Sequence, residues 1–163
     1  MQFKTSFLSP LGKINLYAEP TGLTGLYFSE HKYFKDIKYV QETPGLNIFK
    51  EVENWLSLYF EGKNPKINFA FKLLGTPFQM EVWQILTSIP YGKTETYGEI
   101  AKKILKRTGG SAMSAQAIGN AISHNKISII IPCHRVIGSN GNLNGYAGGI
   151  DKKRFLLNLE NAL

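Results

Sequence analysis

The stretch Ile131-Pro132-Cys133-His134-Arg135-Val136 contains the single cysteine of this 163-residue chain. It follows a run of β-type residues, 127–131, and precedes a glycine-rich segment, 138–149. An ionised cysteine is a strong nucleophile, and positive charge from neighbours such as His134 and Arg135 favours the ionised form. The pattern predicts a nucleophilic thiol at the end of a strand.

The adjacency of Cys133 and His134 does not by itself make a catalytic pair. Consecutive side chains on a strand point to opposite faces, so Pro132 must turn the backbone or a water must bridge the two groups. A free cysteine is also more often a small, buried packing residue than a nucleophile. Both interpretations stay open at this point.

The composition limits the classes of site that the chain can form. With 43% hydrophobic residues, it can build a core as one domain or two small ones. One cysteine excludes an intramolecular disulfide and a multi-cysteine zinc site. The three histidines, His31, His124 and His134, are too dispersed to suggest a metal motif, so we expect no metal and no other cofactor.

Charge and hydropathy bear on the compartment and the partner. No apolar run is long enough to cross a membrane and no signal peptide is evident, so we expect a cytoplasmic protein that keeps its thiol reduced. The net charge of +7 suits a polyanionic partner, although charge alone favours nucleic acid only slightly.

The N-terminal part reads as strands followed by a helix. Three short apolar runs, 3–8, 14–18 and 23–28, are separated by turns that contain proline and glycine, which predicts an antiparallel meander. A helix is expected to begin with Asn47 as its N-cap and to end at Gly62. Residues 29–46, between the last strand and this helix, show no clear pattern. The N-terminal part as a whole carries no recognisable chemistry.

A polar segment near residues 61–75 is expected to separate two domains, 1–70 and 71–163. In the second, Thr76-Pro77-Phe78-Gln79 and Thr96-Tyr97-Gly98-Glu99 are capping boxes that begin two helices.

Two further helices are expected in this second part. One runs from Ser111 or Ser114 to His124, with Asn125 as a left-handed terminator, and the last begins at Asp151. The first of them, together with the helix before it, has the pattern of a helix-turn-helix, which is a weak signal because many helical hairpins bind nothing.

The third helix of the second part is rich in small residues, which let a backbone approach another surface closely. These residues are Ala115, Ala117, Gly119, Asn120 and Ala121. Basic residues that flank it and can neutralise phosphates are Lys102, Lys103, Lys106, Arg107 and Lys126. A helix packed in a core with solvated lysines around it would look the same.

Several motifs in a fixed order remove much of this ambiguity. They are Ile131 to Val136, Gly145-Tyr146-Ala147-Gly148-Gly149, Gly75-Thr76-Pro77-Phe78-Gln79, Val82-Trp83 and Ile89-Pro90-Tyr91-Gly92. Over about Gly75 to Glu160 the chain resembles the O6-alkylguanine-DNA alkyltransferases, also called methylated-DNA–protein-cysteine methyltransferases. The resemblance implies an α+β fold: an N-terminal antiparallel sheet with a helix (a ribonuclease H-like roll) and a mostly helical C-terminal domain with a helix-turn-helix.

The resemblance also implies a reaction. A protein of this family binds double-stranded DNA as a monomer and rotates an alkylated guanine out of the stack. It transfers the alkyl group from O6 to its own cysteine, here Cys133, without a cofactor. The thioether is not reversed, so each molecule acts once. Whether O4-alkylthymine is also a substrate stays open.

The family's catalytic residues match four positions beside Cys133. His134 matches the base that reaches the thiol through water, and Glu160 matches the carboxylate that orients it. Tyr97 matches the tyrosine that donates a proton to the departing guanine, and Asn125 matches the asparagine that ties the recognition helix to the nucleophile strand. Without the resemblance, Glu160 would be read as a solvated carboxylate, Tyr97 as a packing aromatic and Asn125 as a helix cap.

The resemblance places the other site residues in a base pocket and on the DNA surface. The carbonyls of Cys133 and Val136 would read the guanine amine, and the Ala147 amide would read the O6 edge. The remaining pocket residues are Tyr146, Gly148 and Ser128. DNA contacts are expected from Gln116, Tyr97, Ala115, Ala117, Gly119, Asn120 and Arg135.

Two positions depart from the family pattern. Gln116 stands where an arginine usually fills the gap left by the flipped base, and Ala147 stands where a serine is common. Three other functions were weighed: a lesion-binding protein without transfer activity, a helix-turn-helix regulator, and a thiol hydrolase. The presence of Cys133 argues against the first, and the few base-reading side chains of the small-residue helix argue against the second. Turnover on an acyl or peptide substrate would distinguish the third.

Overall fold

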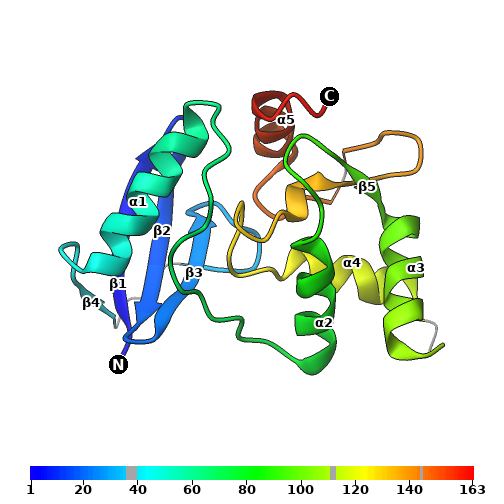
Figure 1. Cartoon of the computed structure of the whole chain (residues 1–163), viewed down its shortest axis with the longest axis horizontal. Coiled ribbons are helices and arrows are strands. Elements are labelled where there is room, and N and C mark those ends of the chain that lie inside the picture. The colour runs from blue at the N-terminus through cyan, green and yellow to red at the C-terminus, as the bar shows by residue number, and fades with distance from the viewer. Residues whose placement is uncertain (36–39, 111–112, 144) are drawn as a thin grey trace.

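The computed structural model of the chain describes residues 1–35, 40–110, 113–143 and 145–163. The expected α+β fold is confirmed (Figure 1). The N-terminal part holds strands β1 (Phe3–Ser9), β2 (Gly12–Glu19), β3 (Gly22–Phe28) and β4 (Gln41–Glu42). They form one sheet in the order β3-β2-β1-β4, in which the first three strands are the antiparallel meander that the turns predict. The short β4, which pairs in parallel with β1, was not predicted.

Helix α1 (Asn47–Phe60) packs against this sheet through a buried stripe. The stripe consists of Phe49, Val52, Trp55, Leu56 and Tyr59, at the expected helical spacing. The cap assignment was wrong, because Leu46 occupies the N-cap position and provides no side-chain cap. Asn47 is already the first helical residue.

The C-terminal part contains helices α2 (Pro77–Leu86), α3 (Tyr97–Thr108), α4 (Ala115–Ser123) and α5 (Ile150–Leu159). Both expected capping boxes are confirmed: the Thr76 and Thr96 hydroxyls each accept a hydrogen bond from the third helical amide. Helix α4 begins after Ser114, and the alternative start at Ser111 lies outside the described residues. The Trp83 indole donates to the Ala121 carbonyl (2.8 Å), which fixes α2 against α4.

The expected strand before the cysteine is not present. Residues 127–131 form a turn with only isolated bridges, and Cys133–Arg135 is one turn of 3-10 helix, followed by β6 (Val136–Ile137), which pairs in parallel with β5 (Glu95–Thr96). The positive φ expected at Asn125 lies instead at Ile129 (71°). Hydrogen bonds within the turn hold Ile129 there, against the preference of a β-branched residue.

The outer edge of β3, which no other strand of the sheet covers, joins the two parts of the chain. The Leu26 amide donates to Lys126 (2.8 Å) and the Ser128 amide donates to Leu26 (2.7 Å), so the turn before Cys133 is attached to the N-terminal sheet. Farther along the same edge, Leu23 exchanges backbone hydrogen bonds with Ala70 and Lys72. In Figure 1 the sheet and α1 accordingly lie on one side and the other helices on the opposite side. Among the described residues, no helix is long and apolar enough to cross a membrane.

Candidate active site

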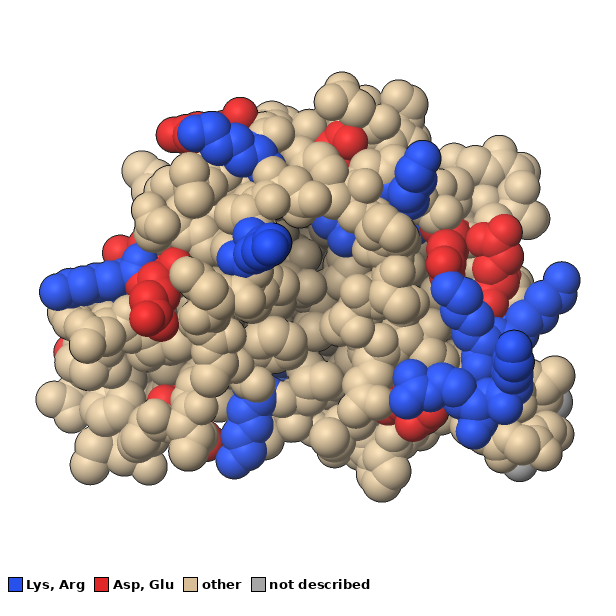
Figure 2. Space-filling model, viewed as in Figure 1, with Lys and Arg blue, Asp and Glu red and all other residues tan. Residues whose placement is uncertain are grey.

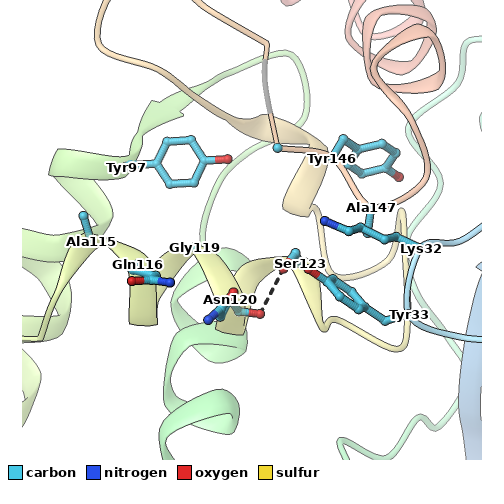
Figure 3. A pocket seen from close by; sticks show the side chains of 11 residues that line it. Lys32, Tyr33, Tyr97, Ala115, Gln116, Gly119, Asn120, Ser123, Tyr146 and Ala147 are labelled. Atoms are coloured by element: carbon cyan, nitrogen blue, oxygen red, sulfur yellow. Dashed lines mark hydrogen bonds between the residues drawn. The ribbon is translucent and has the colours of Figure 1, made fainter.

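A cavity of about 420 Å³ lies between α4, the loop before α5 and the segment after β3. Figure 3 shows Tyr97 and Tyr146 on one side of it, residues of α4 on the opposite side, and Lys32 reaching across from the N-terminal part. The lining residues are Lys32, Tyr33, Tyr97, Ala115, Gln116, Gly119, Asn120, Ser123, Gly145, Tyr146 and Ala147. The face of the molecule that Figure 2 shows has a recess near its middle, and Lys and Arg side chains gather over α3.

A much smaller cavity of about 10 Å³ adjoins this one and contains the thiol. Its lining shares four residues with the larger cavity: Ser123, Gly145, Tyr146 and Ala147. Its other lining residues are His31, Ile122, Ser128, Cys133 and Gly148. The two cavities therefore run from the outer face of α4 to the sulfur of Cys133.

Cys133 is buried in the 3-10 turn, and Asn125 holds both the turn and the sulfur. The Asn125 amide donates to the Ile131 carbonyl (2.8 Å) and to Cys133 Sγ (3.3 Å), and its oxygen accepts from the Ile127 amide (2.9 Å). Burial raises the pKa of the Cys133 thiol, and the hydrogen bond from Asn125 and the charge of Lys153 offset part of that rise. The resting group is a thiol, so a base is needed to ionise it.

His134, the residue that the family resemblance implies as this base, lies in a buried network around Glu160. His134 Nε2 lies 2.6 Å from Glu160 Oε2, and Arg135 Nε donates to Glu160 Oε1 (2.7 Å). The Tyr59 hydroxyl of α1 donates to the same carboxylate (2.5 Å). Burial alone would raise the pKa of Glu160, but these hydrogen bonds outweigh it and lower the pKa to about 2. Glu160 is therefore ionised, and not the solvated carboxylate of the alternative interpretation.

The network fixes the tautomer of His134. Because the ionised Glu160 can only accept, His134 Nε2 must carry the proton, which leaves a lone pair on Nδ1. Burial lowers the pKa of His134 and the Glu160 carboxylate offsets part of that effect. Nδ1 is buried and has no hydrogen-bond partner among the described residues. The result is a neutral imidazole whose free lone pair can take a proton.

Arg135, from which DNA contact was expected, points inward to Glu160. Its side chain is 11% exposed, and its guanidinium donates to Glu160 and to the Ile89 carbonyl (2.7 Å). Because these protein acceptors occupy the guanidinium, we reassign Arg135 from DNA contact to support of Glu160. In the 3-10 turn, the adjacent residues His134 and Arg135 both reach the carboxylate of Glu160. On a strand, consecutive side chains would point to opposite faces.

Three polar residues at or near the site were not singled out in the sequence. Lys153 is buried on α5 and donates to the Val136 carbonyl, the group expected to read the guanine amine. Burial lowers the pKa of Lys153 to about 8. Tyr59 and Lys32 come from the N-terminal part, which showed no chemistry by itself. Lys153 could have been identified from the sequence, because it is a lysine at an inward position of an amphipathic helix. No local sequence pattern indicates a functional role for Tyr59 or Lys32.

Most of the other expected site residues line one of the two adjoining cavities. Tyr97, Ala115, Gln116, Gly119, Asn120, Tyr146 and Ala147 line the larger cavity, and Ser128 and Gly148 line the smaller one. Ala117 lines a different, more open cavity beside α2, and Val136 is buried without lining either.

Gly145 is expected to tolerate no side chain. Its φ is +92°, and a Cβ would lie 2.9 Å from the Tyr97 hydroxyl. Gly145→Ala should displace Tyr97 and slow alkyl transfer by roughly tenfold to hundredfold, because small misplacements of reacting groups are costly. Gly141→Ala is the matched control, since Gly141 has a φ of +80° but no atom within 4 Å of its Cβ position. Single-turnover transfer measures the rates of both variants. Equal rates would contradict the assignment of Tyr97 to the active site.

Family models match nearly the whole chain. Residues 3–73 match the ribonuclease-like domain of 6-O-methylguanine DNA methyltransferase, and residues 77–162 match its DNA binding domain.

Curated relatives and a solved structure agree with these matches. The methylated-DNA–protein-cysteine methyltransferase of Mycobacterium tuberculosis is 43% identical over 152 residues, which are 93% of this chain and 88% of the relative. The Methanosarcina acetivorans protein of the same name is 42% identical over 94% of this chain and 95% of its own. The crystal structure of Mycobacterium tuberculosis OGT in complex with DNA superposes with a TM-score of 0.86 at 40% identity, covering 98% of this chain and 93% of that one.

Proposed function

Because the chain belongs to the 6-O-methylguanine DNA methyltransferase family, we propose that it repairs O6-alkylguanine in double-stranded DNA by moving the alkyl group to Cys133. The observation that carries the proposal is the neutral His134 beside a buried thiol, with Nε2 held by Glu160 and Nδ1 left free. The site opens through a cavity walled by α4, the helix of small residues.

The chemistry is one displacement at carbon. The thiol proton leaves to His134 Nδ1 through a water, as the family resemblance implies, and the thiolate electron pair forms the S–C bond. The C–O6 bond breaks, its electron pair passes to the guanine, and a proton from Tyr97 restores the normal base. The C–S bond of the thioether has no good leaving group for a further displacement, so the reaction stops after one alkyl group per molecule.

The surrounding residues have supporting roles in this proposal. Asn125 holds the sulfur and the turn before it, and the Ala147 amide receives the O6 edge of the base. The small side chains of α4 let its backbone enter the minor groove, where little sequence is read. A repair protein benefits from that indifference because lesions arise in any sequence context.

The proposal also covers the domains, the oligomeric state and the location of the protein. We retain two domains, 1–70 and 71–163, a division supported by the family-model matches. Hydrogen bonds along β3 join the two domains, because the turn before Cys133 belongs to the second domain and is paired with the first. We also infer a cytoplasmic monomer that needs no cofactor.

The test is intact-mass analysis and peptide mapping after mixing the protein with duplex DNA that carries one O6-methylguanine. We expect a gain of one methyl group on the peptide that contains Cys133, ending at one equivalent. DNA binding without methyl transfer would overturn the proposal and favour a lesion-sensing protein. Methyl transfer to another residue would overturn the assignment of Cys133.

Gln116 offers a separate prediction about DNA affinity. It is exposed at the cavity rim on α4, at the position where the family usually has arginine. Gln116→Arg should bind lesion-containing duplex roughly fivefold more tightly, because a guanidinium can stack in the gap left by a flipped base. Gln116→Lys is the control that adds the same charge without a planar group. Fluorescence anisotropy would measure both, and unchanged affinity in Gln116→Arg would contradict the hypothesis.

A further inference from the structure

The small cavity beside Cys133 sets the space available to the group that is transferred. If the base occupies the larger cavity, its O6-alkyl group must enter the smaller one to reach the sulfur. At about 10 Å³ this space is close to one water-sized sphere. A methyl group fits such a space with little adjustment, whereas a benzyl group requires a wall to move.

One wall of this space comes from the N-terminal part of the chain. Most of the described lining residues lie on α4, on the turn before Cys133 or on the loop 145–148, but His31 follows β3. His31 is 2% exposed, so its surface faces protein and cavity and not bulk solvent. No catalytic role assigned above uses it.

The position of His31 is rigidly determined. Its Nδ1 accepts hydrogen bonds from the amides of Tyr33 (3.2 Å) and Phe34 (3.3 Å), and its own amide donates to Phe28 (3.0 Å). The imidazole stacks on the Phe34 ring with centroids 4.7 Å apart. These contacts fix both the backbone and the ring, so the wall does not rotate away easily.

The segment that carries His31 is also attached to the pocket loop. The Lys32 amide donates to the Ala147 carbonyl (2.9 Å), and Lys152 pairs with Glu30 (2.7 Å). Ala147 is the residue whose amide is proposed to receive the O6 edge. His31 is therefore held next to the part of the pocket where the alkyl group is attached to the base.

The chemical state of the ring suits an apolar group. Two amides donate to Nδ1, so the proton of the neutral ring is on Nε2. Burial and the nearby His124 and Lys35 lower the pKa of His31 to about 4, so the ring is neutral at physiological pH. A neutral ring can contact a methyl group without the cost of burying a charge against it.

We propose that His31 is the end wall of the alkyl subsite and restricts efficient transfer to methyl and similarly small groups. This inference rests on the proposed function and adds a substrate range to it. It assigns a specificity-determining residue to the N-terminal part of the chain.

The experiment compares single-turnover rates with duplexes that carry O6-methylguanine or O6-benzylguanine. The wild-type protein should transfer benzyl at least about tenfold more slowly than methyl, since steric exclusion in a pocket has effects of this order. Equal rates in the wild type would overturn the proposal without any variant. Absence of methyl transfer would instead contradict the proposed function itself.

The sharpest variant is His31→Asn. Asparagine Oδ1 can replace Nδ1 as the acceptor for the two amides, so the turn is preserved while the outer edge of the ring is removed. The ratio of benzyl to methyl rates should rise by roughly tenfold. His31→Phe, which refills the space, should keep the ratio low.

His124→Asn is the matched control. His124 stacks on Tyr33 in the same aromatic cluster (centroids 4.0 Å apart) but does not line the small cavity. Its substitution should leave the ratio unchanged. Because each protein serves as its own reference for methyl transfer, partial misfolding changes both rates and not their ratio. An unchanged ratio in His31→Asn, or an equal rise in His124→Asn, would overturn the proposal.

Discussion

Cys133→Ser should abolish alkyl transfer completely while binding to DNA that carries the lesion stays within about twofold of wild type. Serine preserves the shape of the site and an atom that can interact with Asn125. Its hydroxyl is far harder to ionise than a thiol, so a neutral imidazole such as His134 cannot generate the alkoxide. Binding is expected to persist because α4 and the cavity rim do not include residue 133. Mass analysis for transfer and anisotropy for binding measure the two effects separately.

The control for this variant adds methylated duplex to the wild-type protein in two successive portions. After reaction with one equivalent of methylated duplex, a second addition of isotopically labelled duplex should deliver no label. Residual transfer in Cys133→Ser would mean that another side chain accepts the alkyl group. Since the sequence holds no other cysteine, that acceptor would need a chemistry different from thioether formation.

Glu160→Gln should slow transfer by about 10²-fold to 10⁴-fold, the range typical for loss of general-base assistance. Glutamine is neutral, so it no longer favours the imidazolium that forms when His134 accepts the thiol proton. The pKa of His134, already lowered by burial, would fall further, and His134 would become a weaker base. Single-turnover rates with a methylated duplex would show this effect.

The same substitution should reduce the free energy of unfolding by about 3 kcal/mol, because it leaves the Arg135 guanidinium without its carboxylate. The pH dependence has a definite sign. The pKa of Glu160 falls from the usual 4.5 to about 2 on folding, so its stabilising contribution is complete above pH 4.5 and is lost as the pH falls toward 2. Urea unfolding should therefore show a constant difference between wild type and variant at neutral pH, and a smaller one in acid.

Tyr59→Phe is the matched control for Glu160→Gln. It removes one hydrogen bond to the carboxylate and leaves the contacts of Glu160 with His134 and Arg135 in place. A severalfold loss of rate is expected. If Tyr59→Phe were as damaging as Glu160→Gln, the charge of Glu160 would not be the important property. If neither variant slowed transfer, the network would have no role in ionising the thiol.

Local sequence patterns were sufficient for the capping boxes and for the meander, although not for the N-cap of α1. The capping boxes at Thr76 and Thr96 were identified correctly because a cap involves residues only three positions apart. The antiparallel meander followed from turn residues between short apolar runs. The type of reaction was implied by the family resemblance of the motifs around Cys133, because the adjacent thiol and imidazole alone left other functions open.

The same reasoning was wrong where distant residues override local preference. Residues 127–131 have strand composition but form a turn, because β3 and the Asn125 side chain satisfy their backbone groups in that shape. Asn125 was assigned the left-handed conformation that Ile129 adopts. Tertiary hydrogen bonds stabilise the strained residue, and no local pattern records them.

The sequence by itself determined the fold class and the two capping boxes, and the family resemblance identified the proposed nucleophile with its base. Only the tertiary structure decided which charges and rings surround that nucleophile. Tyr59 reaches Glu160 across 101 positions of the chain, Arg135 turns inward to the same carboxylate, and His31 lines the small cavity from the N-terminal part. Such contacts depend on how the sheet packs against the helices, and that packing is a property of the whole core and not of any one segment.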